Sequence, residues 1–147
     1  MFQFSDSDYR SIEKILEGRF VREEHSMRMV LEHPDEKRKL SLEIYCGIPI
    51  GREKGNLVSV YTDTSHLQLH FCTGYVVSEV LGEVTFVAQQ GGRLCGLIIE
   101  KGAACSLYAN VDSKLLSGDL TRLGPEVMLS GIALSLAENV FSEKMFE

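Results

Sequence analysis

The chain has 147 residues, 44% of them hydrophobic and 24% charged, a balance typical of a globular protein rather than a disordered one. Fifteen Lys and Arg against 21 Asp and Glu give a formal net charge of −6. Because nucleic-acid-binding proteins normally carry a basic face, neither nucleic acid nor an anionic membrane surface is an expected partner. No apolar run reaches the roughly 18 residues of a membrane span, so no membrane insertion is expected. The length is typical of one domain, and we predict a single domain over residues 1–147.

The first predicted element is a helix over about residues 6–17. Ser5 and Asp8 form a capping-box pattern, in which a short side chain accepts an otherwise unpaired backbone N–H. Gly18 stands where a left-handed residue would end the helix. Apolar residues at three- and four-residue spacing place one stripe on this helix: Tyr9, Ile12, Ile15 and Leu16.

Between about residues 20 and 111 the apolar period changes to two, which predicts β-strands. The clearest strand alternates Leu40, Leu42, Ile44 and Cys46 with polar neighbours. The glycine-rich residues 47–56 are predicted as a loop. Because the later separators are short, successive strands should be antiparallel neighbours. We therefore predict an α+β fold built on an antiparallel meander of about six to eight strands, either a barrel or a strongly curved sheet. Further strand-like runs lie at about 57–62, 66–72, 75–81, 83–89, 93–100 and 104–111.

A longer helix is predicted over about residues 125–142. It begins at Gly124-Pro125-Glu126, with proline at the first helical position, and carries a broad apolar stripe. Residues 94–99 are apolar on both faces of their strand, so both faces need a cover. We expect the helix to pack on these late strands, or to be shared with a second subunit. Residues 112–123 are predicted as a loop or short helix.

The four cysteines show neither C-x-x-C spacing nor a nearby histidine at zinc spacing: Cys46, Cys72, Cys95 and Cys105. The N-terminus lacks the basic start and apolar stretch of a signal peptide. We therefore expect reduced thiols and a cytoplasmic location, because disulfides follow the redox compartment. The alternative is a secreted protein with two disulfides.

His66, Gln68 and His70 should share one face of a strand. Residues four apart on a strand are roughly 13 Å apart, too far for both histidines to bind one metal. Arg52 and Lys54 are the best anion contacts in the glycine-rich loop. Of the two, Arg52 is included with the three strand residues, and Tyr45 adds a polar aromatic group. We predict these five residues as ligand-binding, with no catalytic residue, metal site or cofactor, because no catalytic or nucleotide motif is present.

Gly18-Arg19-Phe20 follows the first predicted helix, and a meander and a terminal helix come next. This order resembles that of the calycins, the lipocalin-type barrels, although the chain has no Trp for their G-x-W motif. The resemblance implies an apolar barrel interior in which Tyr45, His66, Gln68 or His70 faces a ligand. The favoured function is a non-enzymatic domain that binds a small, partly apolar ligand. The alternatives are a dimeric adaptor or chaperone-like interaction domain, and an enzyme whose cavity site lacks a linear motif.

Overall fold

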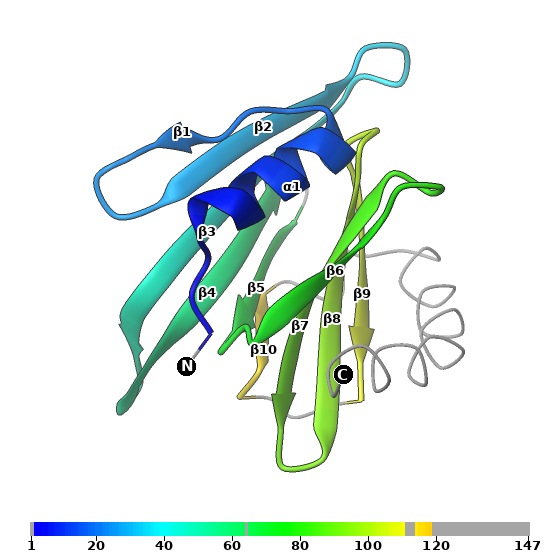
Figure 1. Cartoon of the computed structure of the whole chain (residues 1–147). Helices are drawn as coiled ribbons and strands as arrows, with labels where there is room; N and C mark the ends of the chain where they lie inside the picture. The colour runs from blue at the N-terminus through cyan, green and yellow to red at the C-terminus, as the bar shows by residue number, and fades with distance from the viewer. Residues whose placement is uncertain (1, 64, 111–113, 119–147) are drawn as a thin grey trace.

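The computed structural model describes residues 2–63, 65–110 and 114–118, which form one N-terminal helix and two antiparallel sheets (Figure 1). The six-stranded sheet has the order β1 (Val21–Arg22), β2 (Met27–His33), β3 (Arg38–Ile50), β4 (Glu53–Thr62), β5 (His66–His70), β10 (Leu116–Gly118). The four-stranded sheet has the order β6 (Gly74–Ser78), β7 (Glu83–Gln90), β8 (Arg93–Glu100), β9 (Ala104–Ala109). The antiparallel α+β prediction is confirmed. The barrel prediction is wrong, because the two sheets do not close on each other.

Helix α1 spans Asp6–Leu16 and has the capping box expected from the sequence. The Asp8 N–H donates to Ser5 Oγ at 3.2 Å, and the Ser5 N–H donates to Asp8 Oδ2 at 2.8 Å. Glu17, rather than Gly18, takes the left-handed conformation. Gly18 is needed for close packing instead, because a Cβ there would lie 2.8 Å from Met29 Sδ. Among the described residues, no helix is long and apolar enough to cross a membrane.

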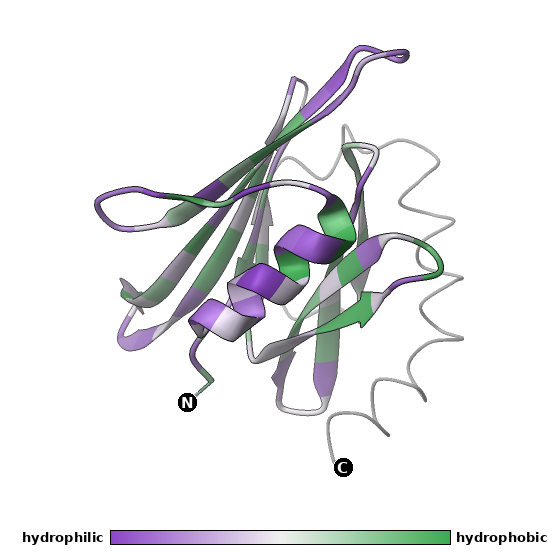
Figure 2. Ribbon diagram, turned by 45° about the horizontal axis from the view of Figure 1, so that its top comes forward, coloured by the Kyte–Doolittle hydropathy of each residue, from purple (hydrophilic) through white to green (hydrophobic). Residues whose placement is uncertain are grey.

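The core lies where α1 covers the two sheets (Figure 1). The apolar stripe of α1 is buried and its polar residues face outward (Figure 2). Along β2, β3 and β5, buried apolar residues alternate with more exposed, mostly polar ones, as the period of two predicts. One apolar cluster includes side chains of α1 and of both sheets, among them Ile12, Leu42, Leu69, Phe86 and Leu97.

Residues 47–56 are not a loop. β3 and β4 continue through this region as a hairpin, and only Gly51 and Arg52 form the turn. The register shifts between Tyr45 and Ile48, so that two residues of β3 face Asn56 alone in a β-bulge. Gly47 and Gly51 both have φ of +63°, which explains the glycines without a loop.

The predicted meander is interrupted between β5 and β6. Phe71 has φ of +58°, and beyond it the chain leaves one sheet for the other. The Cys72 N–H donates to the Asn56 carbonyl at 3.0 Å, and the Thr73 N–H donates to the Val87 carbonyl at 2.8 Å. Residues 116–118, predicted as part of a loop or short helix, form β10 beside β5. The predicted helix over 125–142 lies outside the described residues.

Candidate functional site

Three of the five predicted ligand-binding residues lie together on the outer face of the six-stranded sheet. His66, Gln68 and His70 point away from the core, because the intervening Leu67 and Leu69 are buried in it. His66 Nε2 lies 3.0 Å from Ser59 Oγ, and the His66 ring stacks on Tyr61 with 4.0 Å between centroids. These side chains are therefore already engaged with neighbours on the sheet.

His70 and Gln68 also hold β10 against β5. His70 Nε2 is 2.9 Å from Ser117 Oγ, and His70 Nδ1 is 3.1 Å from the Lys114 carbonyl oxygen. Ser117 Oγ donates to Gln68 Oε1 at 3.1 Å. The two histidines thus have distinct hydrogen-bond partners, and the described residues contain no group of three or more His, Cys, Asp or Glu that could hold a metal ion.

Tyr45 lies in the same cross-strand row as His70, with Leu57 between them. The Tyr45 hydroxyl donates to Glu43 Oε2 at 2.5 Å, and this bond, with partial burial, raises the pKa of Tyr45 to about 12. Arg52 is exposed at the β3–β4 turn, away from that row. Four of the predicted residues therefore share one face, and their role in ligand binding stays a prediction.

The space between the sheets, where the predicted barrel cavity would lie, is filled by apolar side chains. Leu42, Leu69, Phe86 and Leu97 are all fully buried there. Cys72 is also buried, and burial raises the pKa of its thiol to about 12. Its Sγ donates to the Gly74 carbonyl at 3.3 Å. This thiol is therefore protonated at neutral pH and is a poor nucleophile.

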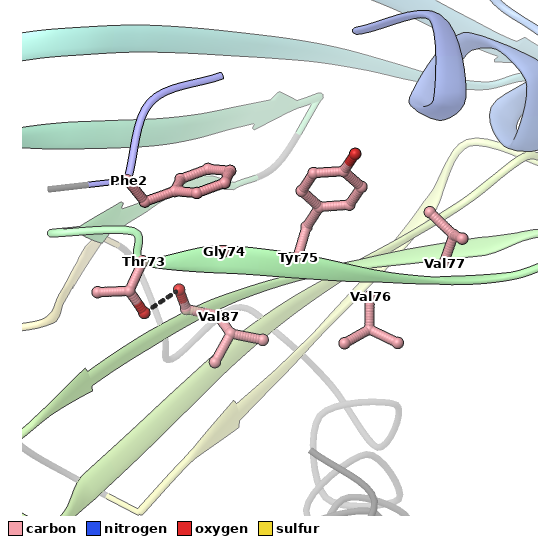
Figure 3. A pocket seen from close by; sticks show the side chains of 7 residues that line it. All are labelled: Phe2, Thr73, Gly74, Tyr75, Val76, Val77 and Val87. Atoms are coloured by element: carbon pink, nitrogen blue, oxygen red, sulfur yellow. Dashed lines mark hydrogen bonds between the residues drawn. The ribbon is translucent and has the colours of Figure 1, made fainter. Parts of the chain in front are cut away.

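A hollow of about 390 Å³ lies along β6 instead (Figure 3). Phe2, Tyr75 and Val77 lie on one side of the strand, and Val76 and Val87 lie on the other (Figure 3). The hollow therefore follows an edge of the sheet rather than one of its faces. None of the five predicted residues lines it. Its full lining is Phe2, Thr73, Gly74, Tyr75, Val76, Val77 and Val87.

β6 is an edge strand, paired on one side with β7. Alternate residues of an antiparallel edge strand turn their N–H and C=O groups away from the neighbouring strand. Within residues 2–63, 65–110 and 114–118, no backbone hydrogen bond reaches this outer side of β6. Residues 71–78 also carry no charged side chain that would block a further strand. The edge therefore offers both backbone hydrogen-bonding groups and an apolar surface.

Hydrogen bonds fix the walls of the hollow. The Tyr75 hydroxyl donates to Asp8 Oδ1 at 2.7 Å, which joins β6 to α1. Burial, together with this bond, raises the pKa of Tyr75 to about 12. Thr73 Oγ1 donates to the Val87 carbonyl at 3.3 Å (Figure 3), and the Phe2 ring lies 6.4 Å from the Tyr75 ring. The hollow is therefore preformed by side chains from three segments.

Comparison of this chain with protein families, with curated proteins and with solved structures found no match.

The sequence contains one sign of this site. Tyr75, Val76 and Val77 are apolar on both faces of their strand, a pattern that indicates cover on both sides. In the structure these residues are only partly buried, because β6 lies at the edge of its sheet. The edge position depends on which strands pair, and local periodicity does not contain that information.

Two large apolar side chains are exposed in the turn that follows β6. Val80 is 95% exposed and Leu81 is 65% exposed. They lie between Ser78 and Glu83, the last cross-strand pair of the β6–β7 hairpin. The hollow, by contrast, includes Thr73 and Gly74 at the other end of β6. One strand therefore has an apolar hollow that runs along it from Thr73 to Val77 and an exposed apolar turn after its end.

Glu83 lies directly opposite Glu100 in the four-stranded sheet. Burial, with a hydrogen bond and repulsion from Glu100, raises the pKa of Glu83 to about 6 from an ordinary value of 4.5. The stability that comes from protonation is fully present below pH 4.5 and is lost as the pH rises through 6. We expect Glu83→Gln to raise the free energy of unfolding at pH 8 by about 0.5–1 kcal/mol, a value reduced for solvent screening.

Urea unfolding of the wild type and the variant at pH 8 and pH 4.5 measures this effect. The gain should shrink toward zero at the lower pH, where wild-type Glu83 is mostly protonated. Glu53→Gln removes the same charge at an exposed position at the start of β4 and is the control. An equal gain for both variants would instead indicate relief of the overall negative charge.

Proposed function

We propose that this chain is a protein-interaction domain whose β6 edge accepts an extended polypeptide segment. The observation that carries the proposal is the hollow along the open edge of β6, where no described backbone group pairs with the side of the strand that faces away from β7. Strand addition at a sheet edge gains affinity from main-chain hydrogen bonds and specificity from pockets for alternate side chains. The proposal corresponds to the interaction domain considered from the sequence.

The residues of the hollow have separate roles in this function. Alternate N–H and C=O groups of Gly74–Ser78 pair with the incoming segment. Its side chains on one side of the sheet pack beside Phe2 and Tyr75, and those on the other side pack beside Val76 and Val87. Because Asp8 and the Val87 carbonyl hold Tyr75 and Thr73 in place, little of the site must be ordered on binding.

Binding of a capped, alternating Thr–Val octapeptide tests this function. We expect a dissociation constant on the order of 100 µM, typical of a small edge interface, and slowed amide exchange in Gly74–Ser78. The control is the same peptide N-methylated at every residue, which keeps the side chains but has no backbone N–H to donate to β6. Equal binding of both peptides, or no protection of β6, would contradict strand addition.

A small apolar ligand is the second candidate occupant. The volume of about 390 Å³ falls within the range of small-ligand pockets, and the lining is mostly apolar. A ligand in this hollow would agree with the ligand-binding function expected from the sequence, but it would bind away from the five predicted residues. Native mass spectrometry of gently purified protein would show such a ligand as extra mass that is lost on denaturation.

We also propose that residues 125–142 pack as a helix on the outer face of the four-stranded sheet. Val87, Ile98 and Tyr108 form a second apolar cluster on that face and are buried there. α1 and the six-stranded sheet pack with the other face, so this cluster needs a different cover. The broad apolar stripe of residues 125–142 suits that place.

We also propose a cytoplasmic location, which is expected from the sequence because the cysteines show no disulfide pattern.

A further inference from the structure

We propose that the partner at the β6 edge is a second copy of this chain, bound about a two-fold axis at Val76. This inference rests on the proposed function, since it names the strand that the edge accepts. It is carried by two features: the hollow that begins at Thr73 and Gly74 and runs along β6, and the exposed turn at Val80 and Leu81 that follows β6. Each copy has both features, as a two-fold interface requires.

The geometry of the strand restricts the register, and Val76 is the central residue of Gly74–Ser78. A two-fold axis perpendicular to the sheet keeps the inner face of one copy beside the inner face of the other. Residues on the same face of β6 must therefore pair, and an axis at Val76 achieves this by pairing Val76 with the partner's Val76. Tyr75 then lies opposite the partner's Val77, and Gly74 lies opposite the partner's Ser78. The two four-stranded sheets become one continuous antiparallel sheet.

This register brings the exposed turn of one copy to the hollow of the other. Val80 is four residues beyond the axis, and Cys72 is four residues before it. The partner's Val80 is therefore level with Cys72, next to the part of the hollow formed by Phe2 and Thr73. Two such contacts, one at each end of the paired strands, would cover both copies of the 95%-exposed Val80.

Electrostatics do not oppose this pairing along the strand. Residues 71–78 contain no charged side chain, so self-pairing places no like charges directly opposite each other there. Of the charged groups beside the strand, Asp8 accepts a hydrogen bond from the Tyr75 hydroxyl at 2.7 Å, and Glu79 forms an exposed pair with Lys14 at 3.9 Å within one copy. Because the paired strands have only five residues each, the interface is small. We expect a dissociation constant on the order of 10–100 µM.

Sedimentation velocity of the full chain from 1 to 500 µM tests the dimer. Val76→Lys and Val76→Glu should each weaken it at least about tenfold, because either variant places like charges together at the axis. An equimolar mixture of the two should dimerise again, which separates pairing at Val76 from misfolding. Val30→Lys, an exposed position on β2, is the control and should leave the dimer intact.

The results that would overturn these proposals are distinguishable. A wild type that stays monomeric at 500 µM while the Thr–Val peptide still protects β6 overturns the dimer and leaves the proposed function standing. A monomer that also fails to bind the peptide overturns both. A dimer that both Val76 variants leave intact, or a mixture that does not dimerise although each variant is folded by circular dichroism, overturns the Val76 axis.

Discussion

Replacing Asn56 with Asp is expected to lower the free energy of unfolding by about 3–5 kcal/mol at pH 8. Asn56 is only 1% exposed and joins three segments. Its Nδ2 donates to the Phe2 carbonyl at 2.6 Å and to the Cys72 carbonyl at 3.3 Å, and its Oδ1 accepts the Gly47 N–H at 3.1 Å. A carboxylate cannot donate to either carbonyl, so it would be a buried charge facing two acceptors.

The cost of Asn56→Asp should fall at low pH. Burial beside two carbonyl oxygens would raise the pKa of the new carboxyl in the folded protein. The stability gained by protonating it is present at low pH and is lost as the pH rises through that elevated pKa. Urea unfolding at pH 5 and pH 8 measures the difference. Asn110→Asp is the control, because Asn110 is exposed and accepts a hydrogen bond from Arg93 at 3.2 Å. Equal losses at the two positions would contradict the buried role of Asn56.

Phe86→Ala is expected to cost about 3–5 kcal/mol by leaving a cavity beneath α1. Phe86 is fully buried on the core face of β7. Its ring centroid lies 6.1 Å from that of Phe4 and 6.5 Å from that of Tyr75. The loss therefore includes aromatic contacts as well as buried area. It should appear as a lower midpoint in denaturant unfolding.

Phe86→Leu is the matched variant for this site. It keeps most of the apolar volume and should cost much less than the alanine variant, about 1–1.5 kcal/mol. Because Phe86 also supports Tyr75, the alanine variant should weaken peptide binding at β6 more than the leucine variant does. If the alanine substitution costs less than about 1 kcal/mol, Phe86 is not the centre of the core.

Local chemistry was sufficient to predict most of the elements and the pairing of successive strands, but not the division into two sheets. Ser5 and Asp8 with one apolar stripe specify α1, and the alternation from Leu40 to Ile44 specifies β3. Neither pattern says which strands lie side by side. The number of predicted strands favours a barrel, whereas the chain changes sheets at Phe71. That change depends on hydrogen bonds to the distant Asn56.

The glycine-rich segment shows a related limit. Gly47 and Gly51 are local signals for a loop, but each serves one special backbone angle inside a long hairpin. At the candidate site, the polar stripe of His66, Gln68 and His70 was correctly placed on one strand face. The hollow was missed because the edge position of β6 is a property of the whole sheet order.

The position of β10 has a consequence for the order in which the chain assembles during synthesis. β10 pairs with β5, although 47 residues separate Ser117 from His70, and all four strands of the other sheet lie between them. Those four strands form local hairpins, which close quickly. The six-stranded sheet instead stays incomplete on the ribosome until β10 has emerged. Until then the edge of β5 stays open, and a nascent chain is most exposed to wrong strand pairing during that interval.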